Sequence, residues 1–415
     1  MTDTMHVWPI EPFEENNELV VSAMIENDGS KPFQLWFKIP AEHKNELTRS
    51  CDPFVIALIF HGMKNANTMI VHGQVSPSLL QNLEEFQAIW VNWDPVKYKK
   101  IEIKAMEEKE ADDLTDSNKA IMAFSGGLDS CFTAFQHKKD FCGRLKRNIT
   151  SAILIHGFDI PLSDKEVFNQ CLEKGKIILK DLNIELIPMA TNFRDLKDYW
   201  SHAHAGGLAA SLSLFQKGYE SGIIAASFSY SSLDLNIGWG SNPVSDLFLS
   251  SKNFKIINDG SRYERIDKLK YLNDNWPQVL DNLRVCWSGT QLDRNCCKCE
   301  KCIRNIICLY ALGKKLPKSF EFDITGKQIE NVIIPDHAVL FEYKCALAEA
   351  KKRGNREPWV KSLERSIRLN TQRLDGKKFI WKQIKSKIAI RTRMRSFYNN
   401  YLAGKNLENY EGAIK

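Results

Sequence analysis

The sequence of 415 residues contains no long apolar run and is sparing in glycine and proline. Because no stretch of about 18 uncharged apolar residues occurs, we expect no membrane-spanning helix. With 22 glycines and 14 prolines the chain is neither collagen-like nor of low complexity, and its 43% hydrophobic content excludes a disordered chain. The first twenty residues carry several glutamates and no apolar core of a signal peptide, so we expect a soluble protein of the cytoplasm.

Positive charge is concentrated in the last part of the chain. Residues 351–415 hold 18 lysines and arginines against five aspartates and glutamates, a net charge of +13 in a chain whose total is +6, so the remainder carries −7. A basic segment on an acidic body suggests a polyanionic partner such as nucleic acid. The alternative is a helical surface docked against the body, because the same segment holds apolar residues at roughly helical intervals.

Disulfide bonds are not expected, since an intracellular chain keeps its thiols reduced. Of the 11 cysteines, however, five fall within residues 286–302, and this clustering indicates a metal site. CxxC spacing lets one turn present two thiolates to a tetrahedral Zn²⁺ ion. A site with four sulfur ligands has no open position for substrate and is structural. The predicted zinc ligands are Cys286, Cys296, Cys299 and Cys302. Cys297 breaks the spacing and is predicted not to be a ligand. A redox-active CxxC pair or an iron–sulfur cluster is the alternative to a zinc site.

The domain organisation follows from the pattern of apolar residues. Residues 1–110 predict a β-rich N-terminal domain, with strand-like runs at Glu18–Ile25, Phe33–Ile39, Phe54–Phe60 and Ala88–Asn92. The charged stretch 104–116 is either an acidic linker or a solvated helix. Residues 316–415 predict a helical, basic C-terminal region.

Between these regions, residues 117–315 alternate short apolar strands with longer helices. The predicted strands are Ala120–Phe124, Ser151–Ile155, Ile184–Pro188 and Gly222–Ala226. The predicted helices are Ser130–Lys139, Asp164–Asp181 and Tyr199–Lys217. This alternation predicts an α/β fold with a parallel sheet, in which ligands bind beyond the carboxyl ends of the strands.

The first of these strands runs directly into the hexad Ser125-Gly126-Gly127-Leu128-Asp129-Ser130, and a helix follows. Two adjacent glycines let consecutive N–H groups face a ligand, and the start of a helix favours an anion. The serine hydroxyls can donate to phosphate oxygens, and Asp129 can hold Mg²⁺ beside them. An ordinary turn with Asp129 as the helix cap is the alternative. We predict a phosphate site here, with Ser125 and Asp129 as catalytic residues.

This hexad resembles the SGGxDS loop of the ATP pyrophosphatases, also called PP-loop enzymes, and it lacks the lysine of P-loop NTPases. The resemblance implies a doubly wound parallel sheet of the adenine nucleotide alpha hydrolase-like type that binds ATP at the loop. In that superfamily a substrate oxygen attacks the α-phosphorus, which yields an adenylate and pyrophosphate. The resemblance also places His156 and Gly157 over the adenine, although a satisfied surface histidine is the alternative for His156.

The cysteine segment resembles a narrower family. Asn295–Arg304 is similar to the Cys-rich end of the 7-cyano-7-deazaguanine synthases (QueC-type enzymes), with Cys297 where a glycine is usual. Both motifs stand in the order of that family, and the resemblance covers about residues 119–312. Those enzymes use ATP to activate the carboxylate of a 7-deazaguanine and convert it to an amide and then a nitrile. The long flanks resemble QueC-like proteins of bacterial antiviral defence operons, the Qat type in particular, which implies a partner protein from the same operon.

The sequence does not decide two points near the expected ligand: the role of one loop and the identity of a cation. Gly238–Asp246 occupies the region where the synthases hold the base, and its residues suit either ligand recognition or an ordinary turn. A cation should neutralise the developing phosphate charge. The candidates for this cation are Lys252, Lys255, Arg262 and Arg265.

The leading hypothesis is an ATP-dependent C–N ligase. It would adenylate the carboxylate of a 7-deazaguanine-like base, release pyrophosphate, and form an amide, a nitrile or a conjugate with a protein amine. One alternative is an enzyme that modifies bases of tRNA or DNA through the basic tail. The other is a nucleotide-binding subunit without catalysis.

Overall fold

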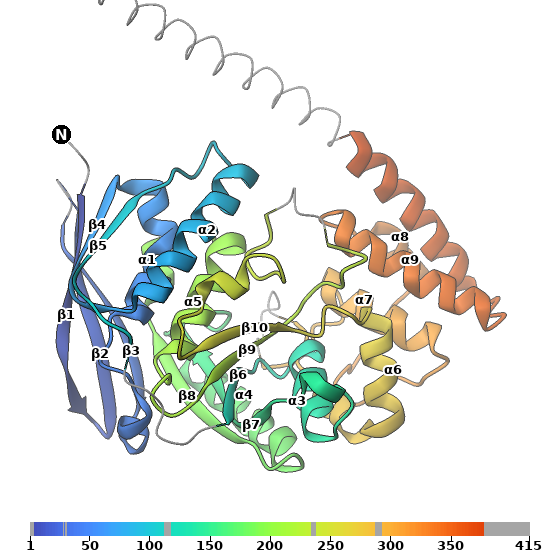
Figure 1. The fold of residues 1–415 in the computed structure, drawn as a ribbon. Helices are drawn as coiled ribbons and strands as arrows, with labels where there is room; N and C mark the ends of the chain where they lie inside the picture. Colours follow the sequence, from blue (N-terminus) through green and yellow to red (C-terminus); the bar gives the residue numbers. More distant parts are fainter. Residues whose placement is uncertain are drawn as a thin grey trace, which may run out of the picture.

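The computed structural model describes residues 4–27, 29, 31–111, 118–233, 238–286 and 293–376. It is an α/β structure built on one sheet of ten strands (Figure 1). The strands are β1 Thr4–Glu15, β2 Glu18–Asn27, β3 Phe33–Pro40, β4 Thr68–Val75, β5 Glu102–Glu108, β6 Lys119–Ala123, β7 Asn148–His156, β8 Glu185–Thr191, β9 Ser221–Ala225 and β10 Lys255–Asp259. The α-helices include α1 Asp52–Asn65, α2 Pro77–Trp93, α3 Leu128–Lys138, α4 Lys165–Lys180, α5 Trp200–Ser213, α6 Arg265–Asn275, α7 Glu300–Ala311, α8 Gly326–Asn331 and α9 His337–Lys352. Residues 358–376 are also helical.

The strands lie in the order β10-β9-β6-β7-β8-β3-β2-β1-β4-β5. Strands β10 to β8 are all parallel, the next three pairings from β8 to β1 are antiparallel, and β1, β4 and β5 are parallel again. The predicted strands and helices between residues 120 and 226 are confirmed as β6 to β9 and α3 to α5, with shifts of a few residues at their ends. The predicted α/β class with a mostly parallel sheet is therefore confirmed.

The strand order reverses at β6. The chain runs from β6 outward through β7 to β8 on one side, and then returns to place β9 and β10 on the other side of β6. In open α/β sheets, the crevice beyond the carboxyl ends of the strands at such a reversal is the usual ligand site. The segment that begins at Ser125 leaves β6 at this position.

Two of the strands predicted in the N-terminal region are helices, although the region also contributes β1 to β5 to the sheet. The run from Phe54 to Phe60 lies in α1 and Ala88–Asn92 lies in α2. Every residue of the first run is buried, so a buried helix and a buried strand give the same continuous apolar pattern. Pro53 and Pro77, in the first turn of each helix, are the sequence signals that favour a helix start.

The same region shares its sheet with the rest of the molecule. Phe37 and Lys38 of β3 pair with Thr191 and Ala190 of β8. The charged stretch 104–116 was expected to be a linker or a helix. For residues 104–108 this expectation is wrong, because they belong to β5, which ends at Glu108. Residues 112–117 lie outside the described part of the chain.

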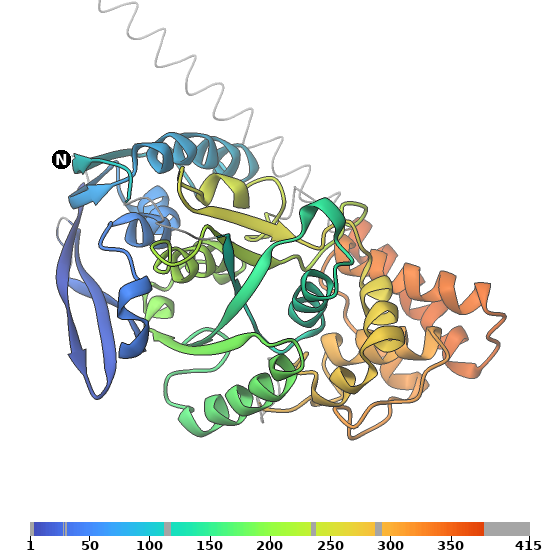
Figure 2. The same cartoon turned by 60° about the horizontal axis from the view of Figure 1, so that its bottom comes forward.

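Helices cover both faces of the parallel strands, and each face has its own apolar core. Neighbouring residues of β6 belong to opposite cores: Ile121 lies in the core that includes residues of α1, α2 and α5, whereas Met122 lies in the core that includes residues of α3, α4, α6, α7 and α9. The N-terminal strands and the C-terminal helices lie on opposite sides of the molecule (Figures 1 and 2). Within the described ranges, no helix combines the length and the apolar character needed to cross a membrane.

Candidate functional site

The loop after β6 turns sharply through its two glycines. Gly126 has φ +72°, a conformation that glycine adopts without a Cβ penalty. Gly127 is the N-cap of α3, and the helix begins at Leu128. Asp129 is therefore the second residue of the helix and not its cap, so the alternative of an Asp129 N-cap is wrong. The N–H groups of the first helical turn have no partner within the helix and point beyond the end of β6.

Both serine hydroxyls support this turn. The Oγ of Ser125 accepts a hydrogen bond from Gly127 N–H at 3.3 Å, and Ser130 Oγ donates to the Gly127 carbonyl at 3.1 Å. The two hydroxyl oxygens lie 3.4 Å apart. Leu128 is buried in the core below, so it anchors the loop by packing, while Ser125 is exposed and Asp129 is half-buried. An anion in front of the loop would thus meet N–H groups and one accessible hydroxyl.

Asp129 holds two cations beside the loop. Its Oδ2 lies 2.9 Å from the guanidinium of Arg265, and its Oδ1 lies 2.9 Å from Nζ of Lys268. Burial alone would raise the pKa of Asp129, but these two cations lower it to about 2. Lys268 is only 2% exposed and also donates to the Ala226 carbonyl, at the end of β9. Both oxygens of Asp129 are engaged, so a Mg²⁺ ion at this carboxylate would compete with Arg265 or Lys268.

Of the four cations expected from the sequence, Arg265 is the one that reaches the loop. Lys255 bonds to the Ser251 carbonyl and Arg262 to the Cys142 carbonyl, whereas the exposed Lys252 is tied to Ser78 through its backbone N–H. Lys268 was missed by the sequence reasoning. It follows Arg265 by three residues in α6, a spacing that places two side chains on the same helix face, and this is the signal that could have found it.

His156 and Gly157 contact protein groups at the end of β7. The ring of His156 is stacked on Phe168 at 4.6 Å, and its Nε2 lies 2.7 Å from the Pro161 carbonyl. Burial lowers the pKa of His156, in keeping with a neutral ring that donates to this carbonyl. Gly157 has φ +100°, and a Cβ there would lie 2.0 Å from the Thr191 carbonyl oxygen. These contacts favour the alternative that the hydrogen-bonding groups of His156 are satisfied within the protein. The close approach of the Thr191 carbonyl explains why residue 157 is a glycine.

The loop that was expected to bind a base or form a turn is held together from within. Asp246 is buried, and it accepts hydrogen bonds from Ser241 Oγ at 2.7 Å, Asn242 N–H at 3.0 Å and Asn258 at 2.9 Å. Burial raises the pKa of Asp246 to about 6, although these hydrogen bonds lower it in part. This carboxylate fixes the loop at the carboxyl ends of β9 and β10. Residues 234–237 lie outside the described part of the chain.

Four cysteines form a cluster with metal-binding geometry. The Sγ atoms of Cys286, Cys296, Cys299 and Cys302 all lie within 4.8 Å of one another. The distances are 3.7 Å between the first and third and 3.9 Å between the second and fourth. Tetrahedral Zn²⁺ with Zn–S bonds of about 2.3 Å requires sulfurs about 3.8 Å apart. The four residues predicted from the sequence are thus brought together, and they fit a metal such as zinc.

Cys297 lies outside this cluster. Its thiol is buried and donates to the Asn295 carbonyl. Its backbone φ is +55°, a left-handed conformation that glycine adopts more readily than any other residue. Cys297 is therefore accommodated at a position whose backbone suits glycine, and its sulfur is not needed for a four-sulfur site.

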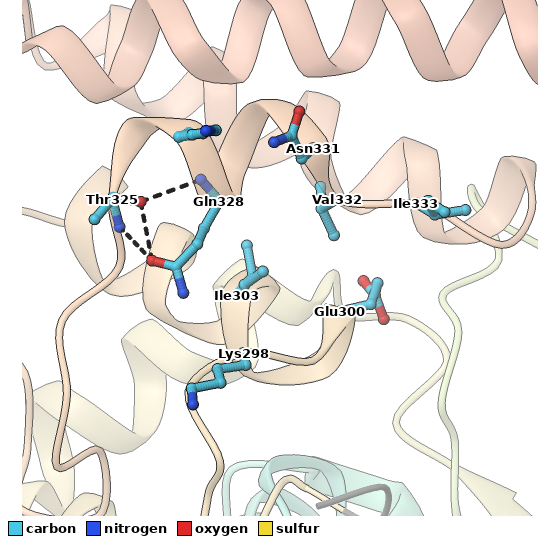
Figure 3. Close-up of a pocket in the computed structure, with 9 residues that line it drawn as sticks. Lys298, Glu300, Ile303, Thr325, Gln328, Asn331, Val332 and Ile333 are labelled. Carbon is cyan, nitrogen blue, oxygen red and sulfur yellow. Dashed lines mark hydrogen bonds between the residues drawn. The ribbon is translucent and has the colours of Figure 1, made fainter.

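A groove of about 550 Å³ lies beside the cysteine cluster (Figure 3). Lys298, Glu300 and Ile303 line one side, and α8 with its flanking residues, from Thr325 to Ile333, lines the other. A capping box at Thr325 and Gln328 closes the first turn of α8 with two mutual hydrogen bonds. None of the residues that line the groove belongs to the loop after β6. The groove is thus a feature of the C-terminal helices and not of the glycine loop.

Comparison of the chain with protein-family models, with curated proteins and with solved structures gives no match. The resemblance to PP-loop enzymes therefore stays a prediction that rests on the loop and the cysteine segment.

Proposed function

We propose that this protein is an ATP-dependent, adenylate-forming enzyme of the PP-loop kind. The observation that carries the proposal is the convergence of three features at the strand-order reversal: a Gly-Gly turn, the N-terminus of α3, and the cations Arg265 and Lys268. Helix N-termini and oriented backbone N–H groups bind phosphate, and preorganised cations stabilise charge that develops during phosphoryl chemistry. In this proposal the fold is the doubly wound sheet that the resemblance implies.

The residues of the loop take distinct roles in this mechanism. Backbone N–H groups from Gly127 to Ser130 hold the two outer phosphates of ATP, with Ser125 Oγ as a further donor. A substrate carboxylate oxygen attacks the α-phosphorus, the bond from that phosphorus to the α,β-bridging oxygen breaks, and pyrophosphate leaves with the electron pair. Arg265 and Lys268 offset the negative charge that accumulates on the phosphates. Asp129 positions these two cations.

The cysteine cluster supports the same proposal indirectly. Zn²⁺ bound to four thiolates has no open position for substrate, so it would stabilise the element that leads into α7 and take no part in the reaction. The site lies within the segment whose sequence resembles the 7-deazaguanine synthases. We therefore propose a 7-deazaguanine-like carboxylic acid as the substrate and an amine as acceptor, supplied by ammonia or by a partner protein of an antiviral defence system in the cytoplasm.

Product analysis tests this proposal. The zinc-loaded protein is incubated with ATP, Mg²⁺ and candidate deazaguanine carboxylates, and the phosphorus products are separated. We expect AMP and pyrophosphate, and a loss of at least tenfold in their rate for Lys268→Met with little change for the exposed Lys270→Met. Formation of ADP and phosphate in place of AMP and pyrophosphate would overturn the adenylation chemistry. Release of pyrophosphate only with carboxylic acids other than deazaguanines would overturn the proposed substrate.

Two alternatives give different results. A nucleic-acid modifying enzyme would bind tRNA or DNA with an affinity that falls steeply with salt and disappears when the basic tail is deleted. A subunit without catalysis would keep its biological activity when Asp129 is replaced by alanine.

A further inference from the structure

A chain of buried ion pairs connects the glycine loop to the C-terminal helices. Arg265 of α6 binds Asp129 through one terminal nitrogen at 2.9 Å, and through its Nε it binds Glu342 of α9 at 2.8 Å. The same oxygen of Glu342 also contacts the guanidinium of Arg304 in α7. Arg304 continues to Glu300, at the start of α7, at 3.1 Å.

The members of this chain are buried together and their charges balance. The side chains of Arg265, Glu342 and Arg304 are 7%, 3% and 4% exposed. With Lys268 beside Asp129, three cations face three carboxylates. A buried charge without a partner is costly, so each member depends on its neighbours. The single carboxylate of Glu342 is the point at which two arginines meet.

Glu342 fixes the orientation of Arg265. A guanidinium is planar, and hydrogen bonds from two different nitrogens define both its position and its plane. Asp129 supplies one of these bonds and Glu342 supplies the other. Without Glu342, Arg265 would keep its contact at the loop but would be free to rotate about it.

We propose that Glu342 is a positioning residue for the nucleotide site, and that α9 is an integral part of this site. The proposal rests on the proposed function, because it assigns Arg265 to ATP. Glu342 lies beyond residue 312, outside the segment that resembles the synthases, so the C-terminal helices complete a charge network that begins at the loop. Arg304 also ties this network to α7, the helix that contains Cys302.

The variant Glu342→Gln tests this role, with Glu349→Gln as the matched control. Both replacements remove one charge from α9, but the ion pair of Glu349 is with Arg353, the residue that follows the helix, and not with a member of the buried chain. ATP affinity is measured by calorimetry, and amide hydrogen exchange is measured at residues 125–130. We expect Glu342→Gln to weaken ATP binding roughly tenfold and to speed exchange in the loop, with the control within about twofold of the wild type.

A second variant protects the test against misfolding. Glu342→Met combined with Arg304→Met replaces the buried pair by apolar side chains of similar volume, a change that is often neutral for stability. It leaves Arg265 with Asp129 alone, so we again expect weaker ATP binding and faster loop exchange. A double-mutant cycle of Glu342→Gln with Asp129→Asn should be non-additive, since both act through Arg265.

The outcomes separate the two proposals. If the wild-type protein does not bind ATP, the proposed function fails, and loop exchange alone then decides whether Glu342 positions the loop. If loop exchange and ATP affinity in both Glu342 variants equal those of the Glu349 control, the positioning role is overturned even though ATP binds.

Discussion

At the scale of single residues, we expect the buried charge of Lys268 to contribute strongly to the stability of the protein. Its ammonium lies 2.9 Å from Asp129 and 2.6 Å from the Ala226 carbonyl, and the residue is 2% exposed. Replacement by methionine keeps the volume but leaves Asp129 with Arg265 alone. We expect Lys268→Met to lower the free energy of unfolding by about 3 kcal/mol, as measured by urea denaturation.

The control for this prediction is Lys270→Met. Lys270 belongs to the same helix, but it is exposed and pairs with Asp274 one turn away. Exposed ion pairs of this kind contribute little to stability, so we expect only a small loss for this variant. Equal losses of stability in the two variants would show that the buried pair has no special role.

His202 predicts a dependence of stability on pH. It is buried in the first turn of α5, and its Nδ1 lies 2.9 Å from the hydroxyl of Tyr98. Burial, aided by the charge of Lys97, lowers the pKa of His202 to about 4, compared with 6.5 in the unfolded chain. The unfolded state therefore takes up a proton first as the pH falls. Stability that is fully present above pH 6.5 should decrease by about 3 kcal/mol as the pH falls from 6.5 to 4.

This dependence is measured by urea unfolding at several pH values between 7.5 and 4. His202→Phe keeps an aromatic ring without a titrating group, so the part of the slope that belongs to His202 should be absent. A variant with the same slope as the wild type would show that His202 does not titrate in this way.

At the scale of elements, the junction between β7 and β8 depends on one glycine. Gly157 has φ +100°, and a Cβ would lie 2.0 Å from the Thr191 carbonyl oxygen, which is backbone and cannot move independently. We expect Gly157→Ala to destabilise the protein by about 3 kcal/mol in denaturant unfolding. Gly143 has φ +56° with open space around it, so Gly143→Ala should cost only about 1 kcal/mol. Equal costs would mean that conformation alone, and not close approach, requires Gly157.

The cysteine element gives a prediction about metal content. Cys299→Ser removes one of four clustered sulfurs, and we expect the purified protein to lose most of its zinc and to melt at a lower temperature. Cys297→Gly should retain one zinc ion per chain, because this sulfur lies outside the cluster and the backbone there suits glycine. Metal analysis measures both. Loss of zinc from the Cys297 variant would contradict the assignment of the four ligands.

The elements differ in how far the sequence predicted them. Strands β6 to β9 and helices α3 to α5 were predictable because short apolar strands alternate with segments of ten or more residues, which are long enough for helices. Helix α1 was not, since it is buried all round between the sheet and α5 and has no polar face to show a helical period. The loop after β6 and the four clustered cysteines were predictable because their residues are close together in the sequence.

At the scale of the whole molecule, the contacts that were missed are those between distant segments. Lys268 meets Asp129 across 139 residues, and Glu342 meets Arg265 across 77. The spacing of Lys268 from Arg265 indicates a shared helix face, but no local pattern shows that this face is buried or which carboxylate it meets. The pairing of β3 with β8 is equally invisible in the sequence, because register between strands from different regions is set by the assembled core. The part of the site that depends on contacts between distant segments could therefore not be predicted from the spacing of residues in the sequence.

Every role proposed for the site depends on nucleotide uptake at the glycine turn. Isothermal titration calorimetry of the zinc-loaded protein with ATP and Mg²⁺ tests this directly, in parallel with Gly126→Ala, whose left-handed backbone a Cβ would strain. We predict that the wild type binds one ATP per chain and that the variant binds at least tenfold more weakly. Absence of binding to the wild type, or equal binding to both proteins, would contradict the central claim.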